Sequence, residues 1–584
     1  MSGSVRARPR RRVLPTASGE PRFGGAAPGA GDPSGPPPRP GILRWGWALL
    51  YAAALGLCFA VYAPSLEGPF VSDDLYYLYG NPAVREPSAA HLVEILSPRS
   101  DLTRMVANYA PVHLLTHTVQ WQLFGERFFG YHATNLALHA LVSVLLVALF
   151  LAAGIARLPA LLGAAFFLLH PANVEAVAWI SQVKTLVAMV LMLTALEARS
   201  RPLAGTLAFA LSLGSKATTA VALPVAVAWR WIRGAGGDPK RWRRERIGML
   251  AWSAIFAAFA VVQLVAFRHA HSGVEPISES RAVQLWTTAA IGARYLWMAM
   301  TSLGVSTFHE PAPVASPFDP WAVAGILSGL ALGARTILAL ARRREEGAWW
   351  LFAAVSFGPV SQFFPFLYPM ADRYLYFMLP GLIGAALLLG ADLTARAPQS
   401  PGARRAATWG ALIVALAVLA LFAVRSHDRA RLWVSEARIF ADGVRHYPEG
   451  TNAAFARAGI VAAQGDVGAA IAALRQASAR GHRDIEDYLR VPSLAALRGQ
   501  PAFDAYLREL AALRVEKLRA IPRLTEGNLI FLARAHLLLG EPEAALAALA
   551  RAREGSGNYE AEIRVLEAEA RSRSRASGPT RPAR

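Results

Sequence analysis

Ionisable residues stand within or at the ends of several apolar segments of this 584-residue chain, where charge is costly and usually serves a function. They form short groups, namely Asp73-Asp74, His170 with Glu175, Lys184, Lys216, His309-Glu310 and Asp372-Arg373. A carboxylate whose pKa is raised suits removal of a proton from a hydroxyl, whereas Lys and Arg suit phosphate. The groups together predict hydroxyl activation beside a lipid phosphate or diphosphate.

The acidic groups also have plainer explanations. Asp73 and Asp74 could share a cation, form a solvated pair or cap a following helix. Glu175 suits the beginning of a helix, where its charge is favourable. With His170 it gives too few ligands to assign a metal. The metal ligands therefore stay unknown, and a divalent cation is left open.

The cationic residues differ in their expected depth. Lys184 lies about ten residues into the apolar segment 174–196, roughly 15 Å along a helix, so we expect it to face a polar cavity. Lys216 lies at the end of a segment and could extend its ammonium to the membrane surface. Arg373 either pairs with Asp372 or presents its guanidinium to a phosphate.

Long apolar segments must position these residues. The chain is 54% hydrophobic and 17% charged, against about 45–50% and about 25% in soluble proteins, which excludes an ordinary soluble enzyme. The single cysteine, Cys58, excludes an intramolecular disulfide. We predict an all-α membrane bundle of about eleven spans. The spans are 42–64, 131–153, 156–170, 174–196, 203–215, 217–232, 248–267, 320–340, 347–366, 373–391 and 407–424.

Four regions follow from composition. Residues 1–41 are a Pro/Gly/Arg-rich tail expected to be disordered, and 42–424 are the membrane domain. Residues 425–572 are rich in alanine with helical periodicity, and two similar units turn at Gly465 and Gly540, which predicts a tetratricopeptide (TPR)-like solenoid. Residues 573–584 are expected to be a loose basic tail.

The net charge of +20 fits the basic cytoplasmic loops of a membrane protein better than nucleic-acid binding. The basic loops are 199–201, 233–246, 342–344 and 404–405. All four lie inside only if the apolar segment 284–305 does not cross the membrane completely. The N-terminus is then cytoplasmic, and the repeat region and the candidate site are extracytoplasmic.

Several motifs, in this order, resemble bacterial relatives of the transmembrane-and-TPR O-mannosyltransferases, within the GT-C class of polyprenyl-phosphate-sugar-dependent glycosyltransferases. They are FVSDD (70–74), YHATNLALH (131–139), LHPANVEAVAWISQ (169–182), SK (215–216) and ADRYLY (371–376), with TPR-like repeats after the last span. The resemblance implies a GT-C fold in the bacterial inner membrane. It also implies that a polyprenyl-phosphate monosaccharide, of mannose or another hexose, is the donor to a protein or glycan hydroxyl.

The resemblance implies that Asp73 or Asp74 is the catalytic base, that basic residues hold the lipid phosphate, and that the repeats bind the acceptor. Two departures from the family pattern stand out. Ala110 replaces an arginine, for which Arg104 or His113 could compensate, and Val183 and Thr185 replace an arginine and an acid. These losses keep a non-catalytic scaffold for envelope proteins as an alternative, and a lipid or solute transporter is a third.

Overall fold

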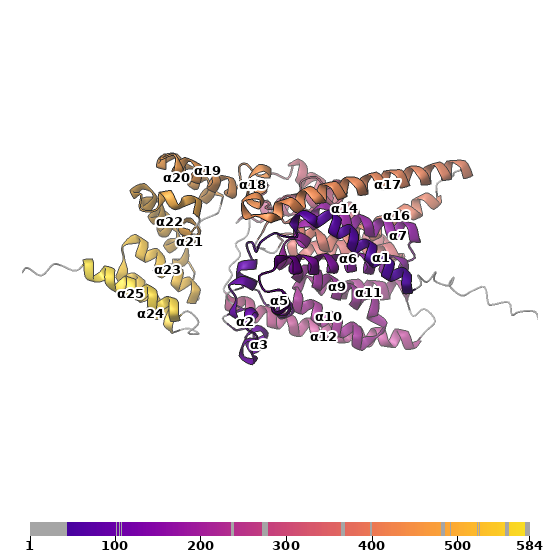
Figure 1. The fold of residues 1–584 in the computed structure, drawn as a ribbon, viewed down its shortest axis with the longest axis horizontal. Helices are drawn as coiled ribbons and strands as arrows, with labels where there is room; N and C mark the ends of the chain where they lie inside the picture. Colours follow the sequence, from indigo (N-terminus) through magenta and orange to yellow (C-terminus); the bar gives the residue numbers. More distant parts are fainter. Residues whose placement is uncertain are drawn as a thin grey trace, which may run out of the picture. The chain divides into compact units, whose positions relative to one another are not determined.

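A computed structural model describes residues 44–577 except 101, 104, 105, 107, 235–238, 271–277, 279, 364–367, 397–399, 481–484, 491, 522, 523, 525 and 555–559. The described chain is helical, and its β structure is limited to one bridge between His309 and Met370 (Figure 1). This confirms the all-α prediction. The chain divides into two units, Met1–Gly46 and Trp47–Arg584, and the contacts below lie within the second. The predicted tail 1–41 lies outside the described residues.

Apolar helices make up the region before residue 431. They are α1 (Arg44–Tyr62), α6 (Phe128–Ala152), α7 (Arg157–Leu169), α8 (Val174–Ala178), α9 (Val183–Glu197), α10 (Pro202–Ser215), α11 (Ala222–Arg233), α12 (Pro239–Ala270), α13 (Arg281–Thr301), α14 (Pro320–Ala341), α15 (Glu345–Phe357), α16 (Asp372–Arg396) and α17 (Pro401–Ala430). Seven described helices are long and apolar enough to cross a bilayer, or eight if one bent pair forms a single span. The chain is an integral membrane protein, and eleven spans stay a prediction.

Ion pairs gather several loops at one end of the bundle, which we call the basic end. Arg233, at the end of α11, pairs with Glu345 at 2.5 Å and donates to the Ala152 carbonyl at 3.4 Å. Arg344, between α14 and α15, pairs with Asp392 near the end of α16 at 2.8 Å. The ends of α6, α11, α14 and α16 therefore lie together.

The opposite end of the bundle, the site end, carries the loop 65–74. His132, at the beginning of α6, contacts the Gly68 carbonyl at 3.0 Å. Both ends of α13 also lie here, because Gln284 donates to the carbonyl of Gln362 beyond α15, and Arg425 donates to the Thr301 carbonyl. The predicted topology requires this placement of the segment 284–305.

The predicted span 174–196 is broken, which corrects the expectation of one continuous helix. Trp179 is extended (ψ 121°) between α8 and the short helix η4 (Ile180–Gln182), and α9 starts only at Val183. The Asn135 amide donates to the carbonyls of Val177 and Trp179 at 3.1 Å each. These bonds satisfy backbone groups that a break in an apolar environment would leave unpaired. Lys184 therefore lies in the first turn of α9 and not in the middle of a helix.

Three shorter helices between α1 and α6 were not predicted. They are α2 (Pro82–Arg85), α3 (Ala89–Leu96) and α5 (Pro111–Phe124). Leu78, Val84, Leu114 and neighbouring buried side chains form a small core among them. This region covers the loop that carries the two adjacent aspartates.

The region after α17 consists of α18 (Glu436–His446), α19 (Thr451–Ala463), α20 (Val467–Ala479), α21 (Ile485–Arg490), α22 (Pro501–Arg519), α23 (Glu526–Leu539), α24 (Pro542–Arg553) and α25 (Glu560–Ser577). The two predicted hairpins are present. Gly465 (φ +87°) and Gly540 (φ +77°) make their turns in the left-handed region, which glycine adopts without a Cβ penalty. The assignment to TPR repeats stays a prediction.

Two helices run across predicted region boundaries. α17 continues through Ala430, so the boundary at 424 falls inside a helix. α25 continues to Ser577, although a loose tail was expected from 573. Pairs four residues apart, such as Arg573 with Glu569 at 2.6 Å, stabilise this last helix. Residues 578–584 lie outside the described part.

Candidate active site

The two adjacent aspartates have different environments. Asp74 is fully buried, and its carboxylate accepts hydrogen bonds from the Val71 N–H at 2.9 Å, the Ser181 N–H at 2.7 Å and the Ser181 hydroxyl. Its oxygens therefore hold the loop 71–74 against η4. Asp73 keeps 36% of its side chain exposed. The acid pair is not equivalent, and Asp73 is the aspartate that a substrate can reach.

Burial raises the pKa of Asp74 to about 7, and the charge of Asp73 adds to the rise. The hydrogen bonds from Ser181 and Val71 act in the opposite direction. The prediction that one of the two carboxyls has a raised pKa thus applies to the buried partner. The buried carboxyl already accepts from Val71 and Ser181 and so holds the loop, and which of the two aspartates is the base stays a prediction.

Asp74→Asn is expected to remove a pH-dependent part of the stability. Because the folded-state pKa lies above the ordinary 3.8, Asp74 stabilises the fold most below about pH 4, and this contribution is lost as pH rises through about 7. The lost part is on the order of 4 kcal/mol. In detergent, the midpoint temperature of thermal unfolding should fall more from pH 5 to pH 8 for the wild type than for the variant. Equal falls would contradict the assignment, and Glu67→Gln, on the exposed start of the same loop, is the control.

Asp73 faces a lysine from α9. Its carboxylate lies 3.8 Å from the Lys184 Nζ, and that ammonium stands 4.6 Å from the centroid of the Tyr77 ring. Lys184 is 12% exposed, so the pair lies at the edge of the buried interior. These two partners are what the structure places beside Lys184, and the polar cavity expected for it stays a prediction.

Lys216 and Arg373 add two further cations. The Lys216 Nζ donates to the Thr185 hydroxyl at 2.8 Å and lies within electrostatic range of Lys184 and Arg373. The hydroxyl is neutral, and Glu175 and the Phe377 ring, whose centroid lies 5.4 Å from the Nζ, compensate the ammonium charge only in part. Several cations close together, with few acidic partners, attract an anion such as a phosphate.

Arg373 pairs with Glu175 and not with Asp372, which corrects one of the two expected partners. The Glu175 carboxylate accepts from the Arg373 guanidinium and, at 2.7 Å, from the Arg373 backbone N–H. The guanidinium also stands 5.4 Å and 5.0 Å from the ring centroids of Trp179 and Tyr368. Arginine has five N–H donors, more than this carboxylate uses.

Asp372 belongs to a second, adjoining cluster. It accepts from His309 Nε2 at 2.7 Å and lies 3.5 Å from the Arg429 guanidinium. The other ring nitrogen of His309 contacts the Tyr447 hydroxyl at 2.9 Å, and Arg429 also pairs with Asp442 at 3.3 Å. The His309 and Asp372 side chains are 1% exposed, so this cluster joins helices and is closed to a substrate.

Two predicted pocket residues have structural roles. His170 is fully buried, and its ring nitrogens bond to the Ala299 carbonyl and the Ala172 N–H. Glu310 accepts from the N–H groups of Thr451 and Asn452 and so caps the beginning of α19. The structure brings Asp73, Lys184, Lys216, Glu175 and Arg373 together at the site end, and it places His170 and Glu310 in contacts outside this group.

The departures from the family pattern fall at or beside this site. Thr185, where the pattern has an acid, accepts from Lys216 and donates to the Gln182 amide oxygen at 2.8 Å. Val183 and Ala110 are buried. His113 is also buried and meets the Tyr77 ring edge-to-face, with ring centroids 4.7 Å apart. Arg104 lies outside the described residues.

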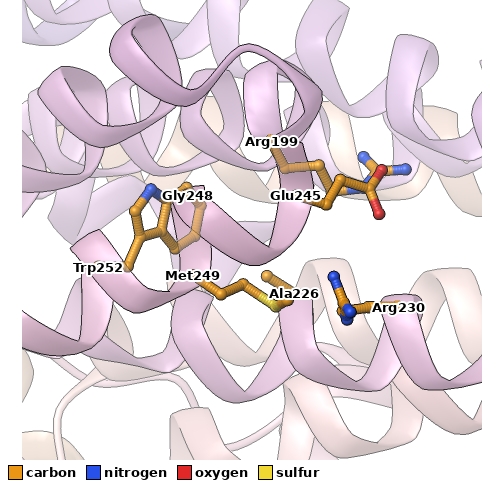
Figure 2. A pocket seen from close by; sticks show the side chains of 7 residues that line it. All are labelled: Arg199, Ala226, Arg230, Glu245, Gly248, Met249 and Trp252. Carbon is orange, nitrogen blue, oxygen red and sulfur yellow. The ribbon is translucent and has the colours of Figure 1, made fainter. Parts of the chain in front are cut away.

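A separate small cavity is lined by residues of α11, α12 and the short helix η5 (Ala198–Ser200) (Figure 2). Its volume of about 10 Å³ holds about one water molecule. Its lining contains none of the candidate site residues; it consists of Arg199, Ala226, Arg230, Glu245, Gly248, Met249 and Trp252. Within the described part of the chain, no three His, Cys, Asp or Glu side chains group as metal ligands.

Sequence reasoning missed several residues beside the site. Tyr77 and Tyr368 supply ring faces to the cations, and Glu436 accepts from the Ser72 N–H at 3.1 Å. Aromatic residues are common in membrane proteins, so their type gave no signal. Glu436 follows Ser435 at the start of a helix, a pattern that indicates a cap and nothing more.

The fold and the site define an all-α integral membrane protein with a carboxylate and three cations at one end of its bundle. The chain is 35% identical over 173 residues to "Protein O-mannosyl-transferase TMTC1" of Homo sapiens, covering 28% of this chain and 19% of that protein. The Mus musculus protein of the same name is 33% identical over 176 residues, covering 28% and 18%. The chain is thus similar to these two proteins, and the match spans about a fifth of their length.

A solved structure is also similar. It is the crystal structure of ArnT from Cupriavidus metallidurans bound to undecaprenyl phosphate, with 16% identity, a TM-score of 0.33, and coverage of 87% of this chain and 80% of that one. No family model matches the chain.

Proposed function

We propose that this protein is a GT-C-type membrane glycosyltransferase. It moves a monosaccharide, mannose or another hexose, from a polyprenyl-phosphate donor to a hydroxyl of a protein or glycan. One observation carries the proposal: the exposed carboxylate of Asp73 lies 3.8 Å from Lys184, at the edge of the cationic group with Lys216 and Arg373. The similarity to proteins named O-mannosyl-transferases supports the same reaction class.

In the proposed reaction Asp73 accepts the proton of the acceptor hydroxyl. The hydroxyl oxygen attacks the anomeric carbon of the donor sugar, and the bond from that carbon to the phosphate oxygen breaks with inversion. Both electrons of that bond leave with the lipid phosphate. Lys184, Lys216 and Arg373 stabilise the charge on the phosphate, which is the main electrostatic contribution. The donor itself supplies the energy, and no resident cofactor is proposed.

We propose that the basic end faces the cytoplasm of a bacterial inner membrane and that the site end is extracytoplasmic. The arginines gathered in the loops of the basic end support this orientation. The helices after α17 would then be extracytoplasmic, where they present the acceptor as a TPR-like region. The 1–41 tail would be cytoplasmic.

The test is donor turnover by the purified full-length protein in nanodiscs. A panel of polyprenyl-phosphate sugars is supplied with an envelope-protein extract as acceptor, with Mg²⁺ or with EDTA. We expect release of polyprenyl phosphate from one donor. Comparison of the samples with Mg²⁺ and with EDTA shows whether the reaction requires a divalent cation. No release from any donor in either arm would contradict the proposal and favour the scaffold.

A further inference from the structure

The segment that follows the last apolar helix packs against the loop that carries Asp73. This segment is the short helix η8 (Arg431–Val434). The Trp433 ring stacks on Trp179 with centroids 5.6 Å apart, and a Cβ built on Gly68 would lie 2.4 Å from the Trp433 carbonyl oxygen. Only glycine fits at position 68, so the loop and η8 are in close backbone contact.

The next helix reaches the residue beside Asp73. Glu436, the first residue of α18, accepts a hydrogen bond from the Ser72 N–H at 3.1 Å. Ser72 has φ +52°, the left-handed conformation that non-glycine residues adopt only at a cost. A strained residue persists where its surroundings hold it, and such residues concentrate at functional sites. The hydrogen bond to Glu436 favours this conformation of Ser72.

α18 is in turn fixed to the bundle. Asp442 accepts from the Thr307 N–H at 2.9 Å, and the Thr307 hydroxyl donates to the Ile439 carbonyl at 2.6 Å. Gly443 lies against the Phe308 side chain, 3.1 Å from the position of a Cβ. α18 is therefore packed between the loop 306–310 and the loop of Asp73, and it continues into α19.

We infer that Glu436 is a positioning residue for Asp73, and that α18 couples the helices after it to the chemistry of the site. The inference rests on the proposed function. Without the Glu436 contact, Ser72 can return to negative φ, which turns Asp73 away from Lys184. An acceptor that binds to α18 or α19 would then also influence the orientation of the Asp73 side chain.

The first measurement is hydrogen–deuterium exchange of the full chain in nanodiscs, which does not depend on activity. In Glu436→Ala the amides around Ser72 should exchange about five- to tenfold faster, because the Ser72 N–H loses its acceptor. Glu449→Ala is the matched control, since Glu449 is exposed and bonds to Gln476 within the later helices. Unchanged exchange in Glu436→Ala would overturn the inference, whatever the turnover.

The second measurement is turnover of the active donor by the same variants. Glu436→Ala should lower kcat about tenfold with an unchanged KM for the donor. Glu436→Gln should restore most of it, because the amide oxygen accepts the same hydrogen bond. Unchanged kcat in Glu436→Ala, no rescue by glutamine, or an equal loss in Glu449→Ala would each overturn the inference. A wild type without turnover would instead refute the proposed function, while the exchange result still decides whether Glu436 holds Ser72.

Discussion

Asp73→Asn is expected to lower donor turnover by roughly 10²–10⁴-fold, the usual contribution of a positioned general base. The amide keeps the size of the side chain and can still lie beside Lys184, but it cannot accept the proton of the acceptor. Because the buried Asp74 accepts the hydrogen bonds from Val71 and Ser181 that hold the loop, folding and donor binding should be retained in this variant. The readout is polyprenyl phosphate release together with donor-dependent thermal stabilisation.

Two companion variants make this result specific. Glu67→Gln changes an exposed acid on the same loop and should leave turnover unchanged. Asp74→Asn should lower stability and, because Asp74 holds the loop of Asp73, should lower the turnover of folded protein less than Asp73→Asn does. A variant set in which Asp74→Asn stops turnover of folded protein while Asp73→Asn does not would show that the base is assigned to the wrong aspartate.

Arg373→Ala is expected to destabilise the protein by about 3–5 kcal/mol, because it leaves the Glu175 carboxylate buried without its cation. Glu175 is 3% exposed, so water cannot replace the guanidinium. The same substitution removes a proposed phosphate ligand, so turnover should be lost even in the folded fraction. Chemical unfolding in mixed micelles measures the first effect and donor release the second.

A double variant separates the two effects. Arg373→Met with Glu175→Leu replaces the buried pair by apolar side chains of similar size, which is often neutral or stabilising. We expect stability near that of the wild type and no turnover. A double variant that regains both would show that Arg373 has only a structural role in this site.

The sequence was a good guide to the helices and to the residue types at the site. Apolar length alone predicts the membrane region, and positive charge in loops predicts which helix ends share one side. Charged residues in or beside apolar segments are costly, so Asp73, Lys184, Lys216, Glu175 and Arg373 stand out without any knowledge of the fold.

The contacts that these residues make in the folded chain could not be predicted from the sequence. Segment 174–196 is uniformly apolar enough to predict one helix, and the break at Trp179 depends on an amide 44 residues earlier, from Asn135. Glu175 and Arg373 are 198 residues apart. The sequence does not distinguish the adjacent Asp73 and Asp74. Their difference depends on Ser181, which lies 107 residues from Asp74 and donates a hydrogen bond to its carboxylate.

The cap on α19 bears on how the chain is assembled. Gly450 precedes α19 and has no side chain to cap it, and the oxygens come from Glu310, 141 residues before Thr451. During synthesis the loop with Glu310 is made long before the helix it completes. The helix pair α19–α20 therefore reaches its final structure only after α13 and the loop that follows it, which carries Glu310, have folded. A fragment that begins at Glu436 lacks Glu310 and so lacks the cap on α19.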